Sequence, residues 1–181
     1  MKKQVLFLRG INVGGHKKVP MAELKKMLAK MGFENIQTIL NSGNVVFDSK
    51  EKAEAVLIEK IADAIQNTFG FSVNVMLRSA EEIKKLIDME PFKKEEIDKS
   101  TRLYITFLNK KNTSELELPY ASAENDFRIL HKTEREVFSV LNIETTKSVD
   151  AMAFLEKEFG KDVTTRNWNT ILKLGKLLGG K

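Results

Sequence analysis

The segment from Arg9 to Pro20 combines glycines with basic side chains, the residue types that bind anions. Glycines let the backbone turn its N–H groups towards a ligand, and a helix that begins after the segment adds partial positive charge at its N-terminus. His16, Lys17 and Lys18 contribute full or titratable positive charge. The segment therefore predicts a site for a small phosphate- or carboxylate-bearing ligand.

This glycine-rich loop differs from the two familiar nucleotide-binding motifs. Gly10 and Gly15 have the Walker A separation, but His16 stands at the lysine position, and Lys17 is not followed by Ser or Thr. The spacing of Gly10, Gly14 and Gly15 also differs from the dinucleotide-binding fingerprint. A predicted β-hairpin after the next helix argues against the parallel sheet that both motifs require. The expected ligand is thus an anion that is bound by neither a Walker A loop nor a dinucleotide-binding loop.

A second polar segment begins the last predicted helix. Thr164 or Thr165 is expected to cap that helix, which places Arg166 in its first turn. Because the helix dipole disfavours a cation there, a bound anion or a carboxylate partner would explain Arg166. Asn167 is the neighbouring candidate, whereas Trp168, the only tryptophan, is expected to pack in the core.

The sequence identifies no catalytic residue, cofactor or metal site. His16 has a side chain suited to proton transfer, but no acidic residue lies near it in sequence, and His131 is expected to be structural. The chain has no cysteine, which excludes disulfides, thiolate catalysis and Cys-ligated zinc. It also lacks an H-x-x-x-H or acidic metal-binding motif. Whether the protein is an enzyme stays open.

Hydrophobic periodicity predicts an alternation of strands and helices. In residues 1–98 we expect strands over 4–9, 36–40, 45–47 and 72–78, and helices over 20–31, 51–69 and 79–89. Residues 41–44 read as a tight turn, and Ser79 with Glu82 reads as a capping box. In residues 99–181 we expect strands over 103–108, 127–131, 137–141 and 162–165, with helices near 112–115 and over 149–159 and 167–178.

The element order predicts an α+β fold made of two tandem ferredoxin-like halves. Each half follows the split βαβ order, β-α-β-β-α-β and then a helix, which gives an antiparallel sheet with helices packed on one face. The first half covers residues 1–98 and the second residues 99–181, packed as one compact unit. The proposed repeat concerns topology alone, because the two halves share no convincing residue identity.

The charge distribution and the hydropathy of the chain restrict the kinds of molecule that it is expected to bind. The 181-residue chain has a formal net charge of +5. Residues 1–30 hold eight basic and one acidic side chain, and residues 161–181 hold five and one. Such clusters favour anionic partners, a small ligand or a nucleic acid. The apolar run Val5 to Leu8 is too short for a signal peptide or a membrane span, so we expect a cytoplasmic protein that does not bind membranes.

Three long phrases resemble an uncharacterised bacterial family, catalogued as domain of unknown function sixteen ninety-seven. They run from Leu8 to Met21, from Leu40 to Phe47 and from Thr164 to Thr170. The resemblance extends from near the first residue to the last helix. It implies a compact bacterial α+β protein in which the three phrases belong to one architecture, and it implies no activity, cofactor or catalytic residue.

The preferred function is binding, with conversion left open, of a small anionic or phosphorylated ligand by the glycine-rich loop. Two alternatives remain, a nucleic-acid-associated protein and a protein-interaction module without a small ligand. On the preferred function, the three phrases line one positively charged concave surface. The candidate ligand-binding residues are Arg9, Asn12, Gly14, Gly15, His16, Lys17, Lys18, Ser42, Asn44, Arg166 and Asn167.

Overall fold

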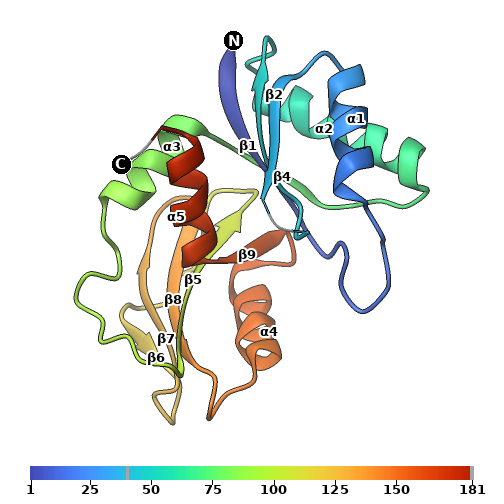
Figure 1. Cartoon of the computed structure of the whole chain (residues 1–181). Helices are drawn as coiled ribbons and strands as arrows, with labels where there is room; N and C mark the ends of the chain where they lie inside the picture. Colours follow the sequence, from blue (N-terminus) through green and yellow to red (C-terminus); the bar gives the residue numbers. More distant parts are fainter. Residues whose placement is uncertain (40, 180–181) are drawn as a thin grey trace. The chain divides into compact units, whose positions relative to one another are not determined.

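Two antiparallel sheets organise the chain, for which the computed structural model describes residues 1–39 and 41–179 (Figure 1). One compact unit comprises residues 1–85 and the described residues from 173 onward, and the other comprises residues 86–172. Leu40, the predicted end of a strand, and residues 180 and 181, the predicted end of the second half, lie outside the described residues. The predicted division after residue 98 stays a prediction.

The first unit has the ferredoxin-like strand order that the sequence predicts. Its elements are β1 (Lys2–Leu8), α1 (Met21–Lys30), β2 (Glu34–Ile39), β3 (Asn44–Ser49), α2 (Glu54–Phe69) and β4 (Val75–Ser79). The strands lie in the order β2-β3-β1-β4, and each neighbouring pair is antiparallel. Placing β3 between β1 and β2 is the split βαβ arrangement.

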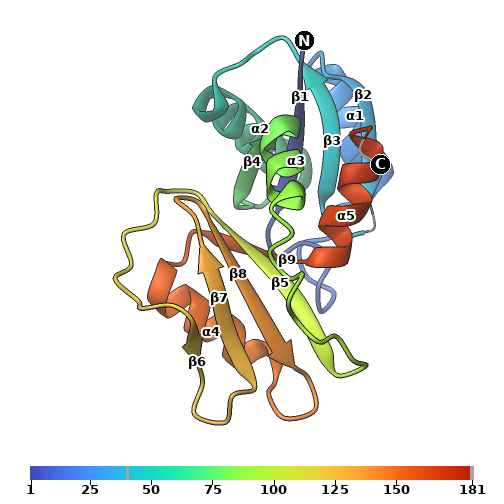
Figure 2. The ribbon, with the colours of Figure 1, turned by 90° about the vertical axis from the view of Figure 1, so that its left-hand side faces the viewer.

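The sheet of the first unit is buried on both faces. Leu24 of α1 and Leu57 of α2 pack with Leu6 of β1 in one apolar core, and each is 0% exposed. Val5 and Phe7 point to the opposite face because side chains alternate along a strand, and they are also fully buried. Figure 2 shows the parts of α3 (Ala80–Asp88) and α5 (Trp168–Leu177) that belong to this unit, residues 80–85 and 173–177, over this second face. The start of α1 is thus fixed on the first face by the core.

The predicted capping box at the start of α3 is confirmed. The Ser79 N–H donates to Glu82 Oε2 at 2.7 Å, and the Glu82 N–H donates to Ser79 Oγ at 3.2 Å. These reciprocal bonds satisfy two backbone donors that the first helical turn leaves without partners. The end of β4 therefore passes directly into a helix.

The second unit repeats the strand order of the first. Its elements are β5 (Thr101–Leu108), β6 (Tyr120–Ala121), β7 (Phe127–Lys132), β8 (Glu136–Asn142), α4 (Ser148–Phe159) and β9 (Val163–Asn167). The sheet order is β6-β7-β8-β5-β9, again antiparallel throughout. The order β7-β8-β5-β9 matches β2-β3-β1-β4, which confirms the predicted repeat of topology.

The short helix predicted near Asn112 is wrong, because the chain between β5 and β6 is not helical. The Ser114 N–H donates to Asn112 Oδ1 at 2.9 Å, and the Leu116 N–H donates to Ser114 Oγ at 3.1 Å. Such side-chain acceptors compete with helical backbone bonds. Pro119 follows closely and provides no N–H to extend a helix. The second unit consequently has a loop where the first has α1.

Asp98 anchors the turn that leads into β5. Its Oδ1 accepts hydrogen bonds from the backbone N–H and hydroxyl groups of Ser100 and Thr101. These bonds, the Thr101 hydroxyl first, lower the pKa of Asp98 to about 2.

We expect this turn to make stability depend on pH. A carboxyl group whose pKa is lower in the folded chain than in the unfolded chain stabilises the fold at pH values above the unfolded pKa. This contribution to stability is lost as the pH falls to the folded pKa. The gap in unfolding free energy between the natural chain and Asp98→Asn should therefore narrow between about pH 4 and pH 2. Urea unfolding at a series of pH values measures it. Thr101→Val should also weaken the pH dependence, and an unchanged gap would contradict the assignment.

Candidate ligand site at the glycine-rich loop

The glycine-rich loop folds into a small hairpin between β1 and α1. The Asn12 N–H donates to the Lys17 carbonyl at 3.2 Å, and the His16 N–H donates to the Val13 carbonyl at 3.2 Å. Gly14 and Gly15 form the tip with φ values of 60° and 78°, a conformation that glycine adopts without steric cost. The glycines therefore serve first to turn the chain.

Asn12 fastens this hairpin to two other segments. Its Oδ1 accepts the Val19 N–H at 2.8 Å, and its Nδ2 donates to the Val19 carbonyl at 3.0 Å. Nδ2 also donates to the Asn41 carbonyl at 2.8 Å, across 29 residues of sequence. One amide side chain thus closes the loop at its exit and joins it to the turn between β2 and β3.

Gly43 provides a second connection between loop and turn. Its carbonyl accepts the Leu8 N–H at 2.9 Å, and its φ is 71°. A Cβ atom at this position would lie 2.7 Å from Leu8 Cβ and 2.8 Å from Ile11 Cδ1. The turn therefore lies directly against the start of the glycine-rich loop, and only glycine fits the space.

The Lys17 side chain and the Arg9 backbone both form hydrogen bonds with the chain itself. Lys17 Nζ donates to the Ser72 carbonyl at 2.9 Å, and the backbone N–H of Arg9 donates to the Asn74 carbonyl at 3.1 Å. Both partners lie in the segment leading into β4, so these contacts hold the loop from a second side. Lys17 consequently has a structural role whether or not it also contacts a ligand.

A surface pocket of about 400 Å³ lies between the loop, the turn and the start of α1. It is lined by Asn12, Gly15, Lys18, Val19, Pro20, Met21 and Asn41. Three of the predicted site residues therefore share one pocket, which contains an exposed lysine. Sequence reasoning missed the contribution of Asn41, although it belongs to the same phrase as Ser42 and Asn44.

The helix end at this pocket has positive character. Pro20 occupies the N-cap position of α1 and makes no side-chain capping bond. The first N–H groups of a helix have no partner within the helix, and they carry the positive end of its dipole. The pocket thus combines a helix N-terminus with the Lys18 ammonium group, an arrangement suited to a single anion.

The remaining predicted residues of the first unit do not line this pocket. Gly14 and His16 lie at the hairpin tip. Asn44 is 0% exposed and donates from Nδ2 to Ser42 Oγ at 2.8 Å and to the Ile39 carbonyl at 3.4 Å. Ser42 and Asn44 therefore stabilise the turn from within, and a ligand-binding role for them stays a prediction.

Arg166 and Asn167 belong to β9 and not to the last helix, which corrects their predicted setting. Backbone pairing places Arg166 opposite Ile105 of β5, so the expected cap at Thr164 or Thr165 does not form. Arg166 Nη1 donates to Thr164 Oγ1 at 2.8 Å and to the Thr165 carbonyl at 2.9 Å. Burial lowers the pKa of Arg166 to about 10, which leaves it cationic at neutral pH.

Neighbouring contacts in the second unit are structural. Asn167 Oδ1 accepts the Asn169 N–H at 2.9 Å at the start of α5. Trp168 is 7% exposed and packs edge-on against Phe92 and Phe138. Because Arg166 and the glycine-rich loop belong to different units, the convergence of the three phrases on one surface stays a prediction.

Among residues 1–39 and 41–179, no helix has the length and apolar character needed to span a bilayer. A family model described as "Protein of unknown function (DUF1697)" matches residues 1–138. No curated protein matches the chain.

The solved structures extend the comparison over nearly the whole chain. The chain is similar to conserved bacterial protein SP0830 from Streptococcus pneumoniae, with 26% identity, a TM-score of 0.73 and 98% coverage of each chain. A protein described as unknown from Galdieria sulphuraria has 13% identity, coverage of 92% and 96%, and a TM-score of 0.28, too low to support any argument. The likeness to the streptococcal protein supports the fold and names no ligand.

Proposed function

We propose that this chain, which belongs to the DUF1697 family of proteins of unknown function, binds a small anionic ligand in the pocket of the glycine-rich loop. The observation that carries the proposal is the meeting of Lys18 with the uncapped N-terminus of α1 in one pocket. A phosphate or carboxylate group is the chemistry that both features favour.

The size and rigidity of the pocket favour a small ligand over a polymer. About 400 Å³ is enough for a nucleotide or sugar phosphate. The Asn12 bonds to Val19 and Asn41 hold the pocket wall in place, and a preformed wall reduces the entropy lost on binding. Glu23, the acidic residue in the first turn of α1, is not part of this pocket wall and lines a different pocket.

A thermal-shift panel of inorganic phosphate, nucleotides and sugar phosphates tests the proposal. A ligand that binds the folded state alone raises the melting temperature. Lys18→Ala should weaken binding of the stabilising compound about tenfold or more, because a charge-assisted hydrogen bond is lost. Lys25→Ala removes an exposed lysine of α1 outside the pocket and should leave the affinity unchanged.

Two results would contradict the proposal, namely no stabilising compound in the panel or equal affinity in the Lys18→Ala variant. A parallel titration with mixed RNA and DNA oligonucleotides separates the nucleic-acid alternative. Binding to a polymer should fall steeply with salt across all sequences, whereas a small-ligand site should favour particular compounds.

A further inference from the structure

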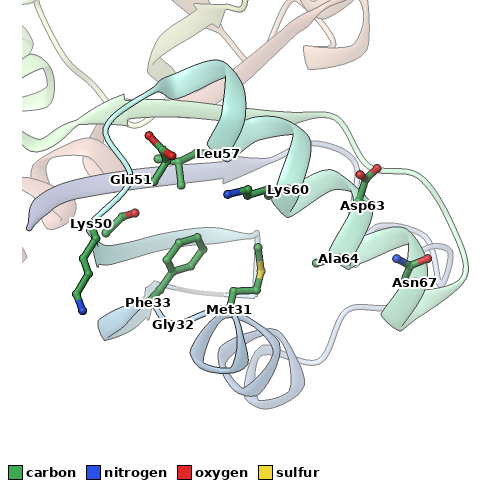
Figure 3. A pocket seen from close by; sticks show the side chains of 11 residues that line it. Met31, Gly32, Phe33, Lys50, Glu51, Leu57, Lys60, Asp63, Ala64 and Asn67 are labelled. Carbon is green, nitrogen blue, oxygen red and sulfur yellow. The ribbon is translucent and has the colours of Figure 1, made fainter.

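A larger pocket lies in the first unit, apart from the residues of the glycine-rich loop. It measures about 650 Å³ and lies between the end of α1, the end of β3 and one side of α2 (Figure 3). Its wall comprises Met31, Gly32, Phe33, Ser49, Lys50, Glu51, Leu57, Lys60, Asp63, Ala64 and Asn67. It shares no lining residue with the loop pocket, so what binds here is a separate question.

The floor of this α1–α2 pocket is apolar and partly aromatic. Phe33 is 9% exposed and Leu57 is 0% exposed, and Met31 and Ala64 complete the apolar surface. The Phe33 ring is supported from behind by Phe47, with ring centroids 4.5 Å apart. Figure 3 shows the Phe33 ring and the Met31 side chain side by side in the pocket. Such a floor suits a flat, weakly polar ring.

Ser49 is the feature of the wall that packing does not explain. It is 1% exposed, and its hydroxyl has no hydrogen-bond partner. Buried polar groups are nearly always paired because an unpaired one costs stability. In the described residues the only other such hydroxyl belongs to Ser139, which lines neither this pocket nor the loop pocket. An unpaired hydroxyl in a pocket wall indicates a ligand that supplies the missing partner.

The charges around the pocket balance one another. Lys50 and Lys60 are matched by Glu51 and Asp63, so no single sign of charge dominates the opening. Glu51 Oε1 already accepts the Lys52 and Ala53 N–H groups at 2.8 Å each, which fixes its position before α2. Figure 3 shows the Lys60 amine directed across the pocket above Phe33. This balance favours an uncharged ligand with hydrogen-bonding edges over an anion.

We propose that the α1–α2 pocket binds an uncharged planar heterocycle, of the kind found in nucleosides. Its ring would pack on Phe33 and Met31, and its polar edge would meet the Ser49 hydroxyl, with Lys60 as a further donor. The Ser49 hydroxyl is shielded from solvent as the side chains stand, so binding requires a side chain of the pocket wall to move. This inference does not depend on the anion site of the loop.

Methyl NMR of methionine-labelled protein provides the test, with adenosine, guanosine, cytidine and uridine as probes. At least one nucleoside should shift the Met31 methyl resonance and leave that of Met76, a buried residue of β4 outside the pocket, unchanged. Ser49→Ala should weaken this binding about five- to tenfold, the value of one hydrogen bond. Because the hydroxyl is unpaired, the variant should fold at least as stably as the natural chain.

Ser139→Ala is the matched control, because it removes the other unpaired buried hydroxyl and should leave nucleoside affinity unchanged. Ala64→Leu narrows the pocket from the α2 side and should also reduce binding. The inference is overturned if no nucleoside shifts Met31 at millimolar concentration, or if Ser49→Ala binds as tightly as the natural chain. Lys18→Ala should leave nucleoside binding intact, so failure here and failure of the anion site are distinguishable.

Discussion

Replacing Gly43 with alanine is expected to destabilise the protein by about 3 kcal/mol or more. The new Cβ would lie 2.7 Å from Leu8 Cβ and 2.8 Å from Ile11 Cδ1. Leu8 is 1% exposed and Ile11 is 3% exposed, and Leu8 Cβ is fixed by its own backbone, so the clash requires backbone movement. The positive φ of 71° adds a further cost for any residue with a Cβ.

Gly32→Ala separates these two contributions. Gly32 has a φ of 83°, but a Cβ there would have no heavy atom within 4 Å. This variant should therefore lose only about 1 kcal/mol, the cost of the left-handed backbone conformation. Chemical denaturation of both variants measures the difference. Equal losses would show that the contact with Leu8 and Ile11 relaxes without cost, contrary to our expectation.

The second large effect is expected at Asn12, where glycine should destabilise the protein by about 2 to 3 kcal/mol and remove ligand binding by the loop. Glycine tolerates the φ of 56° at this position, so the variant isolates the side chain. Three hydrogen bonds to Val19 and Asn41 are lost. Without them the loop keeps only its connection through Gly43 to the turn, and the pocket loses the side chain that fixes its wall.

Asn35→Gly is the matched control for Asn12→Gly. Asn35 also has a positive φ, 51°, but its side chain makes one exposed hydrogen bond, to Asp48 Oδ2 at 2.7 Å. This change should cost less than about 1 kcal/mol. Urea unfolding reports the stability of each variant, and the thermal-shift panel reports the loop pocket. If Asn12→Gly keeps full affinity for the loop ligand, the clamp does not position the site.

Most helices and strands of the first unit could be predicted because each is specified by residues within or next to the element itself. A continuous apolar run located β1, alternating apolar residues located β4, and Ser79 with Glu82 marked the start of α3. The turn at residues 41–44 was predicted from residue types that tolerate positive φ, and Gly43 has that conformation. Short-range chemistry decided these features, so a single sequence was sufficient.

The errors arose where distant pairing overrides local preference. Thr164 and Thr165 are of a residue type that often caps helices. They lie instead in β9, which pairs with β5 some sixty residues earlier in the chain. Asn112 resembles a helix cap as well, but its side chain forms a non-helical turn with Ser114. The residues of a short segment do not show which distant strand will pair with it.

The glycine-rich loop that the sequence singled out does line a pocket, but the contacts of its individual residues could not be predicted from sequence. The loop could be recognised from its glycines and lysines, but not that Lys17 reaches the Ser72 carbonyl 55 residues away. The Asn12 bond to the Asn41 carbonyl spans 29 residues, and nothing local distinguishes Asn12 from other asparagines. The unpaired Ser49 hydroxyl likewise becomes visible only when its surroundings are known.

The segments of sequence that form each unit determine the order in which the two units can be completed during synthesis. Residues 1–85 share a unit with residues from 173 onward, and all of residues 86–172 lie between them in the sequence. Leu174 and Leu178 in the later segment are 0% and 6% exposed. During synthesis on the ribosome, residues 1–85 emerge first, but the first unit is complete only when the residues that follow the second unit have emerged. The second unit is in effect an insertion, whose sequence is contiguous and available to fold earlier.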